Sequence, residues 1–424
     1  MSSETMINAQ KRIPVGRVKP GMYVAGLDRS WLETPFFFHR KLIKSAEEIE
    51  VLKRNGIREV IIDVSRGLDV DGAPAEEPLD ASVGADHRAS KNNGSRTPSA
   101  GELNFRALAL ELETAQRMHQ EALAAAESVF DGVRGGGSIK REIAQRVIAD
   151  LGASIARSPE ASLLLMQMRR FQMDLFVHAV NVCVLSLVVA TLEELDFDAP
   201  ALALGALLHD VGETRIPRNL LRKQDAFTES ERKLLAQHPT LGALLLQNAE
   251  ELPPLVRQIV LEHHERIDGS GYPNRLRGAD VSFASQVVAI TDAYDDMLSG
   301  RNQAPLQPSE VLRQLFLQSN AGALDRALVE RVIRCLGVYP IGSLVELNTG
   351  ERGIVIAANR ADTLKPTVRI MTTRTGMNQY NGPIVSLADT DGGAPERRIV
   401  AALDPGRERI DPLAFLKVAP AVTA

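Results

Sequence analysis

Cysteine and aromatic residues are scarce in this sequence, and the scarcity of each excludes a class of protein. The chain has 424 residues but only two cysteines, Cys183 and Cys335, which stand far apart within apolar segments. This usage argues against a disulfide scaffold and a cysteine-ligated structural zinc, and it fits a reducing cytoplasm. Aromatic residues make up 4% and hydrophobic residues 44%, which favours a soluble, globular protein rich in helix.

Excess charge and long apolar runs are also lacking. The net charge is -5, which provides no general attraction for a nucleic acid polymer or an anionic membrane. The longest apolar run, Phe176 to Leu192, is short for a membrane span and is interrupted by His178 and Asn181. We therefore expect a buried core helix and no membrane span. Met1 to Arg12 is polar, so no signal peptide is expected and the protein is predicted to be cytoplasmic.

Changes in composition along the chain predict a multidomain protein. Turn signals and short strand patterns surround a helical segment near the start, whereas a later stretch is rich in Gly, Pro, Ser, Ala, Asp and Asn. Trp31 and Phe36–Phe38 are expected in the core of the first module rather than in a partner-binding patch. The predicted segments are a small α+β module (1–66), a disordered linker (67–101), a helical stalk (102–137), an all-α catalytic domain (138–338) and a small β-rich segment (339–424).

Apolar residues recur every three or four positions through the long central segment, which predicts an all-α core. Alternating patterns after Tyr339-Pro340 predict short strands instead. The expected helices are 143–155, 163–171, 175–192, 202–211, 234–246, 255–263, 283–298, 311–317 and 328–336, and the expected strands are 343–347, 353–358 and 367–371.

The most informative feature present is a set of potential metal ligands between positions 174 and 301. The chain has eight histidines, and five of them belong to this set. A single histidine is more often a core or surface residue, but five together with inward carboxylates favour metal binding. Imidazoles and carboxylates without thiolates suit a hydrolytic site with Fe, Mn or Zn. The set comprises Asp174, His178, His209, Asp210, His238, His263, His264 and Asp292.

The local context of three of these residues supports the interpretation. Asp174 and His178 are four positions apart and are expected to share one helix face. Asp292 is predicted to lie in the middle of an apolar helix, where a carboxylate is costly unless it is paired or bound to metal.

The pair His209-Asp210, spaced from His178, His238 and Asp292, resembles the HD superfamily of metal-dependent phosphohydrolases. The stretch His263-His264-Glu265 followed by Asp268-Gly269-Ser270-Gly271-Tyr272-Pro273 is similar to the HD-GYP subfamily. This resemblance covers roughly 140–340. The module at 11–66 is similar to a domain of unknown function often fused ahead of such cores, and the tail from Tyr339-Pro340 resembles a segment that follows them.

The resemblance implies an HD-type helical core and a bacterial enzyme that hydrolyses cyclic di-GMP to pGpG and often on to GMP. It implies two or three divalent ions, with Fe or Mn expected first and Zn, Mg or Ni as further options. An activated water would attack phosphorus in line, without a covalent intermediate. The implied catalytic residues are His209, Asp210 and Arg301. The implied metal ligands are His178, His209, Asp210 (bridging), His238, His263, His264 and Asp292. Asp174 stands where some members have a Glu that binds a third metal. The residues implied to contact substrate are Gly271, Tyr272, Pro273 and Asp268, and Arg301 would contact a phosphate.

Two departures from the family pattern concern phosphate contacts. Glu213 stands where the family usually has a lysine, and a carboxylate there either repels a phosphodiester or recruits another cation. Asn302-Gln303 replaces a usual Pro-Tyr pair, and Ala304 a basic residue. Compensation could come from Arg215, Arg222 or Lys223, although a solvated surface role is the simpler expectation for each.

These departures leave two alternatives to the phosphodiesterase open. One is a catalytically weak sensor of cyclic di-GMP or a protein-interaction module, in which metals are retained for structure. The other is an HD phosphohydrolase for another cyclic dinucleotide or a nucleotide. A homodimer through 102–133, and protein partners through the Gly-Tyr-Pro loop or the N-terminal module, also remain open.

Overall fold

The computed structural model divides into two compact units, Met1–Pro98 and Ser99–Ala424, which are described separately. The predicted linker lies largely outside the described residues, as do Trp31 and Phe36–Phe38. The described residues are 10–27, 41–43, 45–54, 57–64, 67–69, 100–134, 141–169, 174–196, 198–221, 223, 225–247, 249, 252–301, 304–379, 382–389, 396–408 and 410.

The first unit is an antiparallel sheet with one helix. Its strands β1 (Gln10–Pro14), β2 (Tyr23–Leu27), β3 (Lys41–Leu42) and β4 (Glu59–Asp63) lie in the order β1-β4-β2-β3. A short 3-10 helix, η1 (Val15–Arg17), follows β1, and α1 (Ala46–Arg54) precedes β4. Ile49 and Leu52 of α1 join Met22 and Ile62 in one buried apolar cluster, so the helix covers the sheet.

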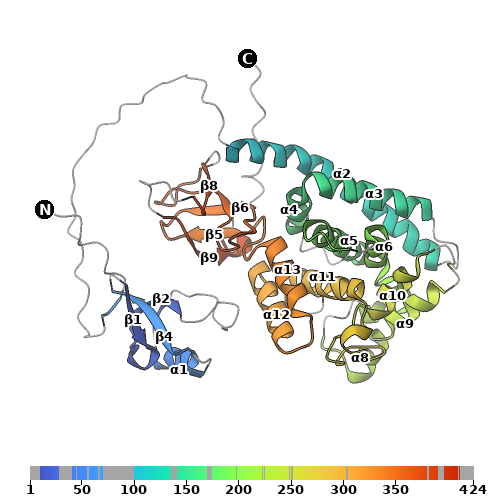
Figure 1. Ribbon diagram of the computed structural model, residues 1–424, viewed down its shortest axis with the longest axis horizontal. Helices are drawn as coiled ribbons and strands as arrows, with labels where there is room; N and C mark the ends of the chain where they lie inside the picture. Colours follow the sequence, from blue (N-terminus) through green and yellow to red (C-terminus); the bar gives the residue numbers. More distant parts are fainter. Residues whose placement is uncertain are drawn as a thin grey trace, which may run out of the picture. The chain divides into compact units, whose positions relative to one another are not determined.

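The second unit has a helical body built around α5 (Leu175–Leu192). Among the described residues, α5 is the one helix long and apolar enough to cross a membrane, and 78% of it is buried inside the protein. This burial agrees with the predicted core helix. A long helix, α2 (Ala100–Arg134), packs against α3 (Arg141–Arg157), α4 (Pro159–Arg169) and α5 (Figure 1). The segment predicted as a stalk therefore buries side chains within the second unit.

Apart from a four-residue helix, α7 (Arg218–Leu221), the remaining helices follow the predicted apolar segments, with two differences. The segment predicted as 202–211 is α6 (Ala199–Leu208) followed by a 3-10 turn, η3 (Val211–Arg215). The segment predicted as 234–246 is two helices, because a capping box at Thr228 begins one and Pro239 lies in the first turn of the next. The other elements are α7 (Arg218–Leu221), α8 (Glu229–Leu235), α9 (His238–Leu245), α10 (Pro254–Glu262), η4 (Gly278–Asp280), α11 (Phe283–Ser299), α12 (Pro308–Asn320) and α13 (Arg326–Leu336).

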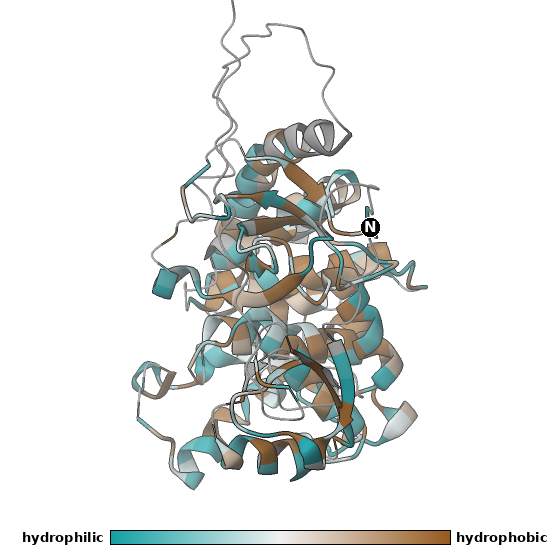
Figure 2. Ribbon diagram, turned by 90° about the vertical axis from the view of Figure 1, so that its left-hand side faces the viewer, coloured by the Kyte–Doolittle hydropathy of each residue, from teal (hydrophilic) through white to brown (hydrophobic). Residues whose placement is uncertain are grey.

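A five-stranded antiparallel sheet lies near the end of the described chain, in the order β8-β7-β6-β5-β9. Figure 2 shows hydrophobic stretches along its strands. One face packs on α2 and α4 through a cluster that includes Leu108, Leu164 and Leu344, so the sheet is joined to the helical body. The sequence predicted three of these strands but not β8 or β9. Their bounds are β5 (Leu344–Leu347), β6 (Arg352–Ala357), β7 (Thr367–Ile370), β8 (Ile384–Ser386) and β9 (Ile399–Leu403), followed by α14 (Pro405–Glu408).

Candidate active site

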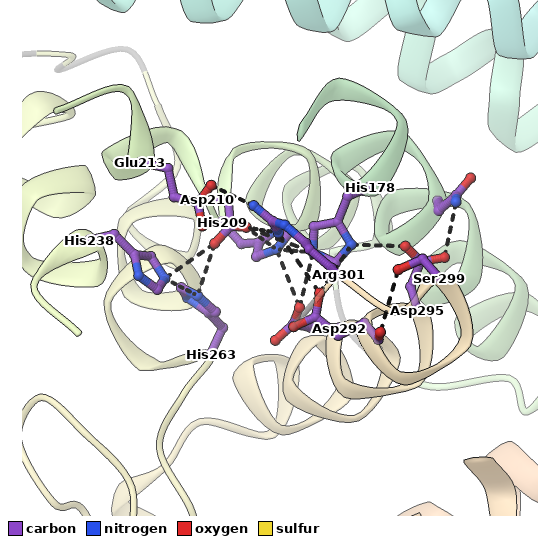
Figure 3. A network of polar contacts seen from close by, with 12 residues as sticks. His178, His209, Asp210, Glu213, His238, His263, Asp292, Asp295, Ser299 and Arg301 are labelled. Atoms are coloured by element: carbon purple, nitrogen blue, oxygen red, sulfur yellow. Dashed lines mark hydrogen bonds and ion pairs between the residues drawn. The ribbon is translucent and has the colours of Figure 1, made fainter. Parts of the chain in front are cut away.

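Asp210 lies at the centre of a buried histidine cluster and directs its two carboxylate oxygens to different partners (Figure 3). Oδ1 is 3.2 Å from His238 Nε2 and 3.6 Å from His263 Nε2. Oδ2 is 3.5 Å from His209 Nε2 and 3.7 Å from His178 Nε2. The carboxylate therefore stands between two histidine pairs, in the arrangement that a bridging ligand requires.

Asp292 provides the second carboxylate of the cluster, from the middle of α11. Its Oδ1 is 3.1 Å from His178 Nε2 and 3.6 Å from His209 Nε2, and its Oδ2 is 3.8 Å from His264 Nδ1. Three groups of side chains have ligand atoms close enough to hold one ion each, and two of the groups contain Asp210. They are Asp210 with His238, His263 and His264, and Asp210 with His178 and His209; a third group is His178, Asp292 and Asp296.

Helix ends bring these side chains together. His209 follows the last residue of α6, His263 follows the last residue of α10, and His238 is the first residue of α9. Gly212 allows η3 to approach α9 closely, because a Cβ at this position would overlap the carbonyl oxygen of His238. Asp292 and His178 come from the buried faces of α11 and α5.

The hydrogen bonds of three histidines determine which ring nitrogen carries the proton. The Nδ1 atom of His209 is 2.7 Å from the carbonyl oxygen of Ala206. In the same way, His238 Nδ1 is 2.8 Å from the carbonyl oxygen of Leu235, and His263 Nδ1 is 2.9 Å from that of Val260. A carbonyl oxygen only accepts, so each Nδ1 donates, and in the neutral imidazole each Nε2 then keeps a lone pair. The Nε2 atoms of His238 and His263 are 3.1 Å apart, and two lone pairs at that separation call for a cation. This donor set fits a divalent ion bound by imidazoles and carboxylates.

Burial and charge adjust the pKa values of the cluster in opposite directions. Burial lowers the pKa of His263 to about 4, which favours the neutral imidazole that a metal ligand needs. Burial would raise the pKa of Asp210, but the neighbouring His209 and Arg301 hold it well below its usual range. The cluster thus combines an ionised central carboxylate with a neutral imidazole beside it.

Asp174 lies outside these groups of the described residues. It is the N-cap of α5 rather than a residue within the helix, and its carboxylate accepts a hydrogen bond from the backbone nitrogen of Phe176 at 2.8 Å. Its side chain is exposed, whereas His178 one turn later is buried. The role of Asp174 as a ligand of a third metal remains a prediction.

Arg301 follows the C-terminal end of α11 and joins the cluster to Glu213. Its guanidinium donates to Asp210 Oδ2 at 2.6 Å and to Glu213 Oε2 at 2.5 Å. Glu213 therefore has a cationic partner within the chain. Burial raises the pKa of Glu213, and Arg301 opposes that rise. Of the proposed compensating cations, Arg215 is exposed, Lys223 pairs with Glu231 at 2.6 Å, and Arg222 lies outside the described residues.

The Gly-Tyr-Pro loop packs directly against the histidine cluster. The Tyr272 ring stacks on the His264 ring with 4.7 Å between centroids, and the Tyr272–Pro273 peptide is cis. Gly271 is required where the loop meets its own beginning, because a Cβ there would overlap the backbone nitrogen of Arg266. Asp268 is exposed, and its carboxylate accepts from the backbone nitrogen of Ser270 at 2.8 Å, so it stabilises the turn.

Sequence reasoning gave no role to four side chains that support or extend the cluster, namely Asn181, Glu265, Asp295 and Asp296. Glu265 accepts from the backbone nitrogens of Asn274 at 2.6 Å and Leu276 at 3.0 Å and so holds the loop closed. Asp295 accepts from His178 and Asn181, and Asp296 belongs to the third ligand group. An available signal was the pair of additional acidic residues after Asp292 in an apolar helix.

Known sequence families match successive parts of the chain. Residues 10–144 match DUF3391, a domain of unknown function, and residues 171–328 match an HD domain. Residues 344–405 match a KOW domain associated with HD domains, which corresponds to the C-terminal sheet. The first match extends beyond the N-terminal sheet to include α2.

Individual known proteins are also similar to this chain. Bd1817, an HDG"Y"P protein from Bdellovibrio bacteriovorus, aligns with a TM-score of 0.43 at 19% identity, over 76% of this chain and 98% of that one. "3'3'-cGAMP-specific phosphodiesterase 2" of Vibrio cholerae is 31% identical over 30% of this chain and 24% of its own length. "Cyclic di-GMP phosphodiesterase PA4108" of Pseudomonas aeruginosa is 32% identical over 366 residues, which are 85% of this chain and 84% of that protein. With this relative aligned over most of both lengths, the chain belongs to the HD-GYP family of HD-domain proteins that carry an N-terminal DUF3391 domain.

Proposed function

We propose that this protein is a cytoplasmic, metal-dependent phosphodiesterase that hydrolyses cyclic di-GMP to pGpG and onward to GMP. The observation that carries the proposal is the position of Asp210, whose two oxygens face separate histidine pairs. The name of the Pseudomonas aeruginosa relative supports cyclic di-GMP as the substrate. The name of the Vibrio cholerae relative keeps a mixed cyclic dinucleotide as a competing substrate.

The proposed centre holds two ions, Fe or Mn, with Asp210 as the shared ligand. We leave Asp174 out of this set because its carboxylate caps α5. When bound, such ions supply Lewis acidity and activate water for attack on phosphorus. The proposed ligands are His178, His209, Asp210 and Asp292 at one position and Asp210, His238, His263 and His264 at the other.

The protein itself contributes orientation and charge to the proposed reaction. Arg301 presents a planar, permanently charged group beside Asp210, where it can bind a phosphate oxygen and stabilise charge that develops on it. The Tyr272 ring covers His264 on the loop side and offers an aromatic surface near the cluster for a guanine base. Glu265 holds this loop by accepting two backbone hydrogen bonds.

A second candidate function is a sensor that binds cyclic di-GMP and cleaves it slowly or not at all. The observation that favours it is the Glu213–Arg301 ion pair, which engages the cation that would otherwise bind phosphate. Replacing Glu213 with lysine distinguishes the two candidates. A large gain in turnover would mean that the natural protein is slow because of Glu213, and unchanged turnover would remove the main argument for a sensor.

The direct test is incubation of the full chain with cyclic di-GMP and Mn²⁺, or with Fe²⁺ under anaerobic conditions, followed by chromatographic separation of the products. The 3'3' mixed dinucleotide is tested in parallel, and Asp210→Asn is the inactive control. We expect pGpG and GMP from cyclic di-GMP at a higher kcat/KM than any product of the mixed dinucleotide. Tight binding without product would favour the sensor, and preference for the mixed dinucleotide would overturn the substrate assignment.

A further inference from the structure

A chain of buried hydrogen bonds connects α2 to the histidine cluster. It begins at His119 on α2, whose Nε2 is 3.3 Å from Asn181 Oδ1. Asn181 Nδ2 then donates to Asp295 Oδ1 at 2.9 Å, and Asp295 Oδ2 is 2.8 Å from His178 Nδ1. His119, Asn181 and Asp295 are each only 2% exposed and His178 only 3%, so the chain is shielded from solvent.

The chemistry of the four groups sets one direction for each bond. The Asp295 carboxylate accepts from both sides, so Asn181 must turn its amide nitrogen toward it and its oxygen toward His119. His119 Nε2 therefore donates to Asn181, and His178 Nδ1 donates to Asp295. With its proton on Nδ1, the neutral His178 ring presents a lone pair on Nε2, which faces Asp292 at 3.1 Å and His209 at 3.2 Å.

Helix α2 contacts α5 both before and after His178. Beyond the contact with Asn181, the Phe130 ring of α2 meets the Phe176 ring of α5 edge to face, with centroids 5.5 Å apart. Ala122 and Ala126 lie between these two contacts and are fully buried, which allows α2 to approach closely. α2 also contacts η3, the turn that follows Asp210.

A ligand site beside His119 does not explain this arrangement. The cavity there is about 10 Å³ and is lined by Met118, His119, Ser154 and Ser162, among others. That volume holds about one water molecule, so no substrate or nucleotide fits. The geometry instead allows His119 to orient a neighbouring side chain, that of Asn181.

We propose that His119 is a positioning residue for the metal centre and acts on His178 through Asn181 and Asp295. This inference rests on the metal centre of the proposed function but not on its substrate. The HD-domain match begins at residue 171, whereas His119 falls within the DUF3391 match. Part of the region that matches a domain of unknown function thus supports the catalytic centre. Displacement of α2 would change the affinity of that centre for metal.

The test measures Mn²⁺ binding to the full chain without substrate, by titration calorimetry and by metal analysis after dialysis. His119→Leu removes the donor, His119→Gln keeps an N–H that can reach Asn181, and Met118→Leu is the neighbouring apolar control. We expect His119→Leu to weaken Mn²⁺ binding ~10-fold, within the ~10- to 100-fold typical of outer-shell partners. We expect His119→Gln to restore most of the affinity and Met118→Leu to leave it unchanged.

The melting temperature of each variant, measured in chelator without metal, distinguishes weaker Mn²⁺ binding from a loss of fold stability. The expected signature is a reduced gain in melting temperature on adding Mn²⁺ to His119→Leu, relative to its own metal-free state. Wild-type affinity in His119→Leu would overturn the inference, as would equal losses in His119→Gln or Met118→Leu. A wild-type protein that binds Mn²⁺ but leaves cyclic di-GMP intact would overturn only the substrate assignment, and one that binds no metal would overturn both.

Discussion

Arg301 donates a hydrogen bond to Glu213 at 2.5 Å, so the carboxylate that stands where the family usually has a lysine forms an ion pair within the chain. The guanidinium also reaches Asp210 at 2.6 Å, so one planar group spans two carboxylates. Glu213 is thus a partner of the proposed phosphate-binding residue, and its negative charge offsets the positive charge that would attract substrate.

Removing the charge of Glu213 is expected to strengthen substrate binding. Glu213→Gln keeps an oxygen that can accept from Arg301 but leaves the guanidinium charge uncompensated on that side. We expect KM for cyclic di-GMP to fall about 3- to 10-fold, since 1.4 kcal/mol corresponds to a factor of ten. Steady-state kinetics at several salt concentrations check this, with Glu213→Asp as the charge-retaining control. An unchanged KM in Glu213→Gln would show that the charge at position 213 is not felt by the substrate.

Arg301→Lys is expected to lower turnover without removing metal. A lysine keeps the charge but cannot span Asp210 and Glu213 as the fork does. Losing one charge-assisted hydrogen bond costs about 1.5–3 kcal/mol, or roughly a 10- to 100-fold fall in kcat. Metal content and kcat are measured together, with Arg313→Lys as the control, because the Arg313 guanidinium also donates two hydrogen bonds to a carboxylate, that of Glu310 on the same helix, α12. Loss of metal in Arg301→Lys would assign the arginine a structural role instead.

Gly212→Ala is expected to reduce metal content by moving α9. A Cβ at 212 would overlap the carbonyl oxygen of His238 and approach the backbone nitrogen of Gly242 at 2.6 Å, so the backbone carrying His238 has to shift. We expect about 1–3 kcal/mol of destabilisation together with weaker Mn²⁺ binding.

Gly152→Ala is the matched control for this change, because Gly152 lies in α3 and, among the described residues, no atom outside its own helical turn lies within 4 Å of an added Cβ. It is expected to raise stability by up to ~1 kcal/mol and to leave metal binding intact. Equal Mn²⁺ affinity in the two variants would contradict the close packing of η3 on α9.

The stability of the C-terminal sheet is expected to depend on the ionisation of Glu351. A hydrogen bond from Arg397 lowers the pKa of Glu351 below 4.5, against the opposing effect of burial, and Thr349 lowers it further. A carboxylate with a depressed folded pKa contributes stability above its unfolded pKa, and the contribution is lost as pH falls through the folded pKa.

Glu351→Gln is therefore expected to reduce the free energy of unfolding by about 1–3 kcal/mol at pH 7. The difference from wild type should shrink as the pH falls below 4.5, where the wild-type carboxylate gains its proton. Urea denaturation followed by circular dichroism at pH 7 and at lower pH measures it, with Glu346→Gln on β5 as the control. A difference that stays constant with pH would mean that packing, not charge, is responsible.

Local sequence patterns determined the elements whose stability is itself local. The predicted helix at 175–192 has the bounds of α5, because a mainly apolar segment begins after Asp174 and ends in polar residues. The candidate ligands could also be found from sequence, because histidine is rare in the chain and acidic residues in apolar helices are costly. Strands β8 and β9 could not, because β9 depends on pairing with β5, which lies about fifty residues earlier.

Only the tertiary structure decided which side chains of the site contact one another, because these contacts join residues that no local sequence pattern relates. Arg301 and Glu213 are 88 positions apart, and nothing local indicated that each would satisfy the other's charge. His119 is 62 positions from Asn181 and was not among the candidate residues. Asp174 is four positions before His178, yet its carboxylate turns to the end of its own helix. Sequence composition thus indicated the candidate ligands, and the packing of α2, α5, η3 and α11 decided which of them meet.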